Sequence, residues 1–216
     1  MQSGAVLDGG SRERTASPLG GASNVLVLSD SMDPEARGSY YRSLLPADPA
    51  SLNVLAVQYT HGPDGWLDEW REHVGESPGR TTVVSVGDGR RGAAAADGGG
   101  TNYGGDDAGS TVSVVESPDD LTGLGITIGS HLERGEEYSG LTLVTLDSLT
   151  VLLQYVDLKR TFRFLHVMVN RVKSAGAIGH YHMDPDAHDE QTVTTLASVF
   201  DAVARYEDGE WRITSR

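Results

Sequence analysis

Three histidines and four acidic residues lie within the eleven-residue stretch from His180 to Glu190, which reads HYHMDPDAHDE. Imidazole nitrogens and carboxylate oxygens bind divalent metals, and two histidines with one carboxylate form a recurrent ligand set. If the stretch begins as a β-strand, His180 and His182 point to the same face, because residues i and i+2 of a strand do. Asp184 or His188 could then complete the set. A metal or small-ligand site at these residues is one hypothesis for the stretch.

The same letters also describe the end of a strand and the start of a helix. The Asp-Pro-Asp sequence favours a turn, and Asp189 with Glu190 would place negative charge at the N-terminus of the following helix. The His-x-His-x-Asp pattern resembles the start of the H-x-H-x-D-H signature of metallo-β-lactamase-like hydrolases. Pro185 stands where that signature has its next histidine, and no histidine follows His188. We favour the structural interpretation, with a ligand-sensing remnant as the alternative and a metallohydrolase as the least supported.

Strand-like and helix-like patterns alternate through the chain. Apolar, β-rich runs occur at 24–28, 52–60, 81–87, 111–116, 141–147 and 177–183. Helices are predicted after Asp33, from Pro63, after Ser117, over 158–175 and from about Asp189, and Asp208-Gly209 predicts a closing hairpin. Several strands are apolar on both faces, which is typical of parallel strands covered on both sides. We therefore predict an α/β fold with a mostly parallel central sheet, helices on both faces and a C-terminal β-hairpin.

One predicted strand ends in a carboxylate. The run LTLVTLDSL, 141–149, places Asp147 and Ser148 at the carboxyl edge of the sheet, which is where open α/β sheets bind ligands. In nucleotide hydrolases an aspartate in this position holds Mg²⁺ directly or through water. An aspartate in a turn after a strand is the alternative interpretation, and the sequence leaves both open.

The element order that follows Asp147 resembles the C-terminal half of RecA-like ATPase domains. An arginine-flanked helix (KRTFRFLHVMVNRVKSAG), a strand, an acidic turn, a helix and a final hairpin succeed one another. The chain is most similar to the KaiC-type subgroup, in particular to its shortened relatives in halophilic archaea, over about 24–213. The resemblance implies a P-loop NTPase topology. It also implies a nucleotide edge at the residues Ser29, Asp30, Arg37, Gln58, Asp147 and Ser148.

The phosphate-binding loop that the resemblance implies is missing. It should follow the first strand as G-x-x-x-x-G-K-[ST], whose backbone N–H groups and lysine hold phosphates. The chain instead reads SDSMDPEARGS over 29–39, without a lysine. The carboxylates of Asp30, Asp33 and Glu35 stand where phosphates would lie, and Arg37 alone could not offset them. Gln58 and the three residues after it replace the glutamate pair that the resemblance implies beyond the second strand.

These departures predict a degenerate ATPase that is not an enzyme and needs neither ATP nor Mg²⁺. We expect a regulatory or protein-interaction module in signalling or transcription control. The resemblance implies a protein partner, either a second copy or an active KaiC-like ATPase. The alternative is a sensor or enzyme that binds a ligand or metal through Asp147, His180 and His182.

Composition restricts the partners further. The chain has 31 acidic against 17 basic residues, a formal net charge of −14, and only two lysines, Lys159 and Lys173. This pattern is typical of halophilic proteins, and the lack of a basic stripe argues against direct nucleic-acid binding. Because the chain has no cysteine, disulfides and thiolate chemistry are excluded. We expect Arg160, Arg163 and Arg171, on one predicted helix, to be solvated.

Segment composition predicts the domain organisation. Residues 1–23 are rich in Gly, Ser and charge, which predicts a disordered leader. A single domain is expected over 24–216, with a flexible Gly/Asp-rich loop at 88–110. No signal peptide or long apolar run is found, so we expect a cytoplasmic protein without a membrane contact.

Overall fold

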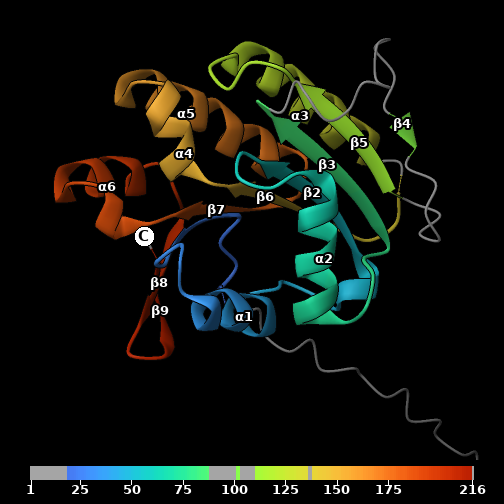
Figure 1. Ribbon diagram of the computed structural model, residues 1–216, viewed down its shortest axis with the longest axis horizontal. Coiled ribbons are helices and arrows are strands. Elements are labelled where there is room, and N and C mark those ends of the chain that lie inside the picture. The colour runs from blue at the N-terminus through green and yellow to red at the C-terminus, as the bar shows by residue number, and fades with distance from the viewer. Residues whose placement is uncertain (1–18, 88–100, 103–109, 136–137, 216) are drawn as a thin grey trace, which may run out of the picture.

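The computed structural model of the 216-residue chain describes residues 19–87, 101–102, 110–135 and 138–215 (Figure 1). Most of the expected leader (1–23) and of the expected loop (88–110) lies outside these described residues. We expected order to start at Asn24, but the described fold begins five residues earlier. Leu19 is only 1% exposed and packs in the core with Val25, because an apolar side chain next to the first strand gains from burial.

Nine strands form one sheet among the described residues, in the spatial order β4-β5-β3-β2-β6-β7-β1-β8-β9. All neighbours pair in parallel except β4 with β5 and β8 with β9. The prediction of a mostly parallel sheet with a C-terminal hairpin is therefore confirmed. The strands are β1 (Asn24–Leu28), β2 (Leu52–Gln58), β3 (Arg80–Val86), β4 (Thr101–Asn102), β5 (Ser110–Val115), β6 (Leu141–Asp147), β7 (Ile178–Met183), β8 (Ala202–Glu207) and β9 (Glu210–Ser215).

Helices cover both faces of the sheet, as predicted (Figure 1). Helices α1 (Pro34–Ser43) and α2 (Pro63–Val74) pack on one face, whereas α3 (Leu121–Gly135), α4 (Leu149–Tyr155), α5 (Leu158–Ser174) and α6 (Glu190–Ala197) pack on the other. Short 3₁₀ turns, η1 (Pro49–Ser51) and η2 (Pro185–Ala187), precede β2 and α6. Strand β1 serves both layers, since Val25 and Val27 face α1 while Leu26 and Leu28 face the opposite core.

Local sequence signals explain most element ends. The carboxylate of Asp33 caps α1 by accepting the N–H groups of Glu35 and Ala36, with Pro34 in the first turn. Asp208 (φ 54°) and Gly209 (φ 82°) both have positive φ, as a two-residue hairpin turn requires.

The predicted start of α3 was wrong. Ser117 and Pro118 lie before the helix, which begins at Leu121, and the Ser117 hydroxyl donates instead to Asp119 Oδ1. Asp120 is the residue whose carboxylate accepts a first-turn N–H, that of Gly123, at 2.8 Å. An acid beside the first turn competes better for the free N–H groups than a serine three residues earlier.

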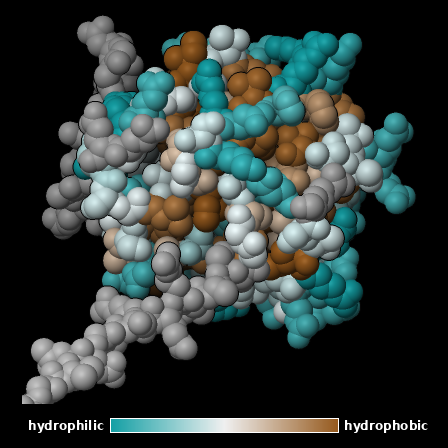
Figure 2. Space-filling model, turned by 180° about the vertical axis from the view of Figure 1, so that it is seen from behind, coloured by the Kyte–Doolittle hydropathy of each residue, from teal (hydrophilic) through white to brown (hydrophobic). Residues whose placement is uncertain are grey.

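On the face seen from behind, the brown apolar residues form several separate surface patches with hydrophilic residues between them (Figure 2). No helix in the described part of the chain is long and apolar enough to cross a membrane.

Candidate functional site

Buried polar side chains gather where β2, β6 and β7 end. Gln58 lies opposite Asp147 in the sheet register, and His180 lies two residues before His182 on the neighbouring strand β7. All four are at most 9% exposed. Because β7 pairs with β6, the two histidines lie close to the edge at which Asp147 lies. The group is covered by α1, whose Tyr40 contacts both histidine rings.

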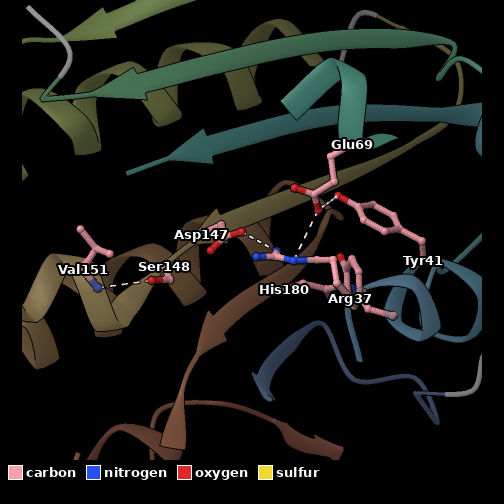
Figure 3. A network of polar contacts seen from close by, with 8 residues as sticks. Arg37, Tyr41, Glu69, Asp147, Ser148, Val151 and His180 are labelled. Carbon is pink, nitrogen blue, oxygen red and sulfur yellow. Dashed lines mark hydrogen bonds and ion pairs between the residues drawn. The ribbon is translucent and has the colours of Figure 1, made fainter. Parts of the chain in front are cut away.

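The guanidinium group of Arg37 points toward the Asp147 carboxylate (Figure 3). Its Nη1 donates to Asp147 Oδ2 at 2.5 Å, and its Nε lies 3.5 Å from Glu69 Oε1 on α2. The Tyr41 hydroxyl donates to the same Glu69 oxygen at 3.0 Å. From sequence we placed Arg37 among the acids of the turn after β1. It instead reaches across to the end of β6 and joins two helices to the sheet.

The charges of this pair are fixed by mutual contact. Burial opposes ionisation of Asp147, but the charge of Arg37, followed by His182, the hydrogen bond from Arg37 and His61, holds its pKa below the usual value. Burial likewise opposes the charge on Arg37, and Asp147 and Glu69 overcome it and raise the pKa. Asp147 is therefore a carboxylate whose negative charge is already neutralised from within the chain.

The turn between β1 and α1 is also internally satisfied. Backbone N–H groups at such a turn and at a helix N-terminus ordinarily attract phosphate. Here the Asp30 carboxylate accepts the N–H of Met32 at 2.7 Å. The Asp33 carboxylate accepts those of Glu35 at 2.8 Å and Ala36 at 3.3 Å.

Asp184 supplies a third carboxylate to this turn from the end of β7. Its Oδ2 accepts both the backbone N–H and the hydroxyl of Ser31, at 3.2 and 2.9 Å. Burial raises its pKa, but these hydrogen bonds and those from Asp186 and Ala187 lower it overall. The Ser29 N–H is bonded to the Met183 carbonyl. Carboxylates of the chain thus hold the donors with which a phosphate would have to bond.

His180 and His182 are neutral, buried rings. Nδ1 of His180 and the Tyr40 hydroxyl share a hydrogen bond of 2.9 Å, and the His182 ring packs edge-on against Tyr40 at 4.5 Å. Burial, with a smaller contribution from His182, lowers the pKa of His180 to about 3. Burial also lowers the pKa of His182 to about 4, although Asp147 acts in the opposite direction.

Three polar atoms in this layer have no hydrogen-bond partner among the described residues: Gln58 Oε1, Thr145 Oγ1 and His180 Nε2. Thr145 lies opposite His180 in the register. Buried polar groups are nearly always bonded, so three exceptions in adjacent strands point to water or a small polar molecule. We missed Thr145 from sequence, although it precedes Asp147 by two residues and must share its face. No local sequence pattern predicted that Glu69 would lie beside Arg37.

The structure does not bring the four candidate metal ligands together. Asp184 bonds with Ser31, and His188 follows η2 with a buried Nε2 that has no partner in the described chain. Within the described ranges no group of three or more His, Cys, Asp or Glu side chains could hold a metal ion. The neighbouring Ser148 is the N-cap of α4, whose Val151 N–H it accepts at 3.3 Å (Figure 3).

A hollow of about 320 Å³ lies at the same edge of the sheet, beside the covered group. It is lined by residues 59–62 and 85–87 and by Pro118 and Tyr155. Asp147 is not among these residues, and its carboxylate is paired with Arg37.

Comparisons with known proteins place the fold. None of the curated proteins matches the chain. A solved structure from a structural study of a Pyrococcus horikoshii OT3 protein is similar over 89% of this chain and 86% of that one, with a TM-score of 0.52 and 14% identity. This likeness concerns the fold alone. The family model described as a family of unknown function, DUF7504, matches residues 22–206, and the chain belongs to that family.

Proposed function

We propose that the chain is a RecA-like module without catalytic activity, which acts through contacts with other proteins instead of ATP turnover. The observation that carries this proposal is the ion pair between Arg37 and Asp147. An aspartate at this edge serves an ATPase only if it can bind Mg²⁺. Separating a buried pair costs about 3–5 kcal/mol, equal to about a hundredfold or more in affinity.

The turn after β1 supports the same proposal. A triphosphate would have to displace the carboxylates of Asp30, Asp33 and Asp184 from their N–H donors. No lysine lies in this turn to offset the phosphate charge. The arrangement keeps the stability and surfaces of the fold while the nucleotide edge is filled with the chain's own groups. The resemblance implies a second copy or an active KaiC-like ATPase as the partner.

Calorimetry with Mg-ATP in concentrated KCl tests the proposal. We expect no saturable heat from the unmodified protein. The proposal would be wrong if Mg-ATP bound saturably with a Kd in the micromolar range or below. That binding would be lost in Asp147→Asn and kept in the control Arg42→Met, which changes an exposed arginine.

A sensor built on Asp147, His180 and His182 is the second candidate function. It is favoured by the unpartnered atoms Gln58 Oε1, Thr145 Oγ1 and His180 Nε2. Elemental analysis of untagged protein and of the His180→Ala/His182→Ala double variant separates the candidates. A stoichiometric metal that the double variant loses would favour the sensor.

A further inference from the structure

Helix α5 departs from the charge of the rest of the chain. It carries Lys159, Arg160, Arg163, Arg171 and Lys173 and no acidic residue, in a chain of net charge −14. Both lysines of the sequence are on this helix. Its apolar side is buried in the core, so the basic side chains lie on its outer side, where Lys173 Nζ is 3.8 Å from Asp201 Oδ1. A basic surface on a strongly acidic protein selects an acidic partner.

Two hollows lie between α3 and α5 on this outer side, of about 690 and 420 Å³. They share Ile126, Val167 and Arg171. Ile126 is 63% and Val167 51% exposed, although both are large apolar residues. Arg160 and Arg163 line the smaller hollow, whereas Glu133 lines the larger one. We call these two hollows together the α3–α5 groove.

Arginine and glycine shape the floor of the groove. Arg171 Nη1 donates to the Gly125 carbonyl at 2.9 Å, and a Cβ at Gly129 would come within 2.8 Å of the same nitrogen. Arg160 also reaches a backbone carbonyl, that of Asp119, at 3.4 Å. As expected, both arginines are exposed to solvent, and each also donates to a backbone carbonyl. Glycine leaves room for the guanidinium to lie across α3.

A complementary feature lies elsewhere on the same chain. Met32, at the tip of the turn after β1, is 85% exposed. Asp30, Asp33 and Glu35 surround it in sequence, and no basic residue stands between 29 and 36. The turn is held by the hydrogen bonds of Asp30 and Asp33, so it presents an apolar tip in an acidic collar. Ser31 ties it to Asp184 after β7.

We propose that the Met32 tip of one copy binds in the α3–α5 groove of a second copy. Met32 would cover Ile126 and Val167, while the acidic collar faces Arg160 and Arg163. This assembly deepens the interaction role proposed above and rests on it. Because the tip and the groove are different surfaces, the contact is head-to-tail and continues into a ring or an open chain.

Light scattering after size exclusion, at low salt and at about 1 M KCl, tests the contact. We expect the unmodified protein to exceed its chain mass of 23.0 kDa, increasingly with concentration. Met32→Asp and Val167→Asp should each stay at 23.0 kDa. Mixed in equal amounts they should form a two-chain species that grows no further, because one keeps the groove and the other keeps the tip.

Matched controls separate the contact from general effects of charge. Arg163→Glu should weaken association at least tenfold at low salt, whereas Lys159→Glu, which makes the same charge change on α5 outside the groove, should leave it unchanged. Met32→Leu should also associate. Circular dichroism verifies that each variant is folded.

Three results overturn the assembly: an unmodified protein that stays at one chain mass, single variants that associate normally, or a mixture that forms no two-chain species. Mg-ATP calorimetry on the same samples addresses the proposed function separately. If Mg-ATP bound, the proposed function would be refuted but the association result would still hold, because neither Met32 nor Val167 contacts Asp147.

Discussion

Replacing Arg37 by methionine is the sharpest test of the buried pair. The variant keeps most of the side-chain volume and removes the charge that faces Asp147. The side chains of Arg37 and Asp147 are 23% and 9% exposed in the folded protein. Without Arg37 the carboxylate remains buried and unpaired, and Glu69 also loses a partner at 3.5 Å.

The expected loss of unfolding free energy follows from burial. Removing one member of a buried pair costs about 3–5 kcal/mol, and the partial exposure of Arg37 places the value near the lower end, about 3 kcal/mol. For a chain of this length that equals a fall of about 6–12 °C in Tm. The double variant Arg37→Met/Asp147→Leu should recover most of the loss, since it leaves no unpaired charge in the core.

The pH dependence provides a second signature of the same pair. In the unmodified protein, the lowered pKa of Asp147 stabilises the fold at pH values above the pKa that Asp147 has in the unfolded chain. This stabilisation is lost as the pH falls through the pKa of Asp147 in the folded protein. In Arg37→Met, burial acts without Arg37, so protonation relieves the strain of the buried charge. The two proteins should therefore approach each other in stability as pH falls from 7 toward 4.

Urea unfolding followed by circular dichroism at constant salt measures these differences. Arg42→Met, on the same helix but outside the pair, should change stability by less than about 0.5 kcal/mol. A loss below about 1 kcal/mol in Arg37→Met, or an equal loss in the single and double variants, would refute the role assigned to the pair.

Three further predictions concern the same layer. Lowering the pH from 7 to about 5 should reduce the free energy of unfolding by about 2 kcal/mol for each of His180 and His182. Their folded pKa values of about 3 and 4 lie below the ordinary 6.5, so only the unfolded chain gains protons in this range. Replacing both histidines by glutamine should make the unfolding free energy, measured by urea titration, depend less on pH. Tyr40→Phe should cost about 1–3 kcal/mol by leaving His180 Nδ1 unpaired, a loss that a thermal melt detects. Asp33→Ala should cost about 1 kcal/mol through the lost α1 cap, and Asp33→Ser should restore most of it.

Local signals in the sequence predicted most of the elements, although not helix α4, and short-range competition explains why the start of α3 was misplaced. Asp33 with Pro34, and Asp208 with Gly209, predicted a helix start and a hairpin because each acts on its own backbone. The start of α3 was placed wrongly because Asp120 lies closer to the free N–H groups than Ser117 does.

The candidate site was only half predictable. The period-two rule placed His180 with His182 and would have placed Thr145 with Asp147. The pair of Arg37 and Asp147 joins residues 110 positions apart, and only the packing of α1 over β6 brings them together. Glu69 lies on α2, and no local sequence pattern predicts how α2 packs against α1.

Both margins of the sheet are poor places for another strand to add. At one end β9 carries Arg212, whose guanidinium bonds with Glu207 and Asp208, and at the other only two residues of β4 belong to the described part of the chain. Charged and very short border strands discourage intermolecular backbone pairing. Fibre-like growth through the main chain is thereby disfavoured, and recognition between molecules is left to helix surfaces and turns.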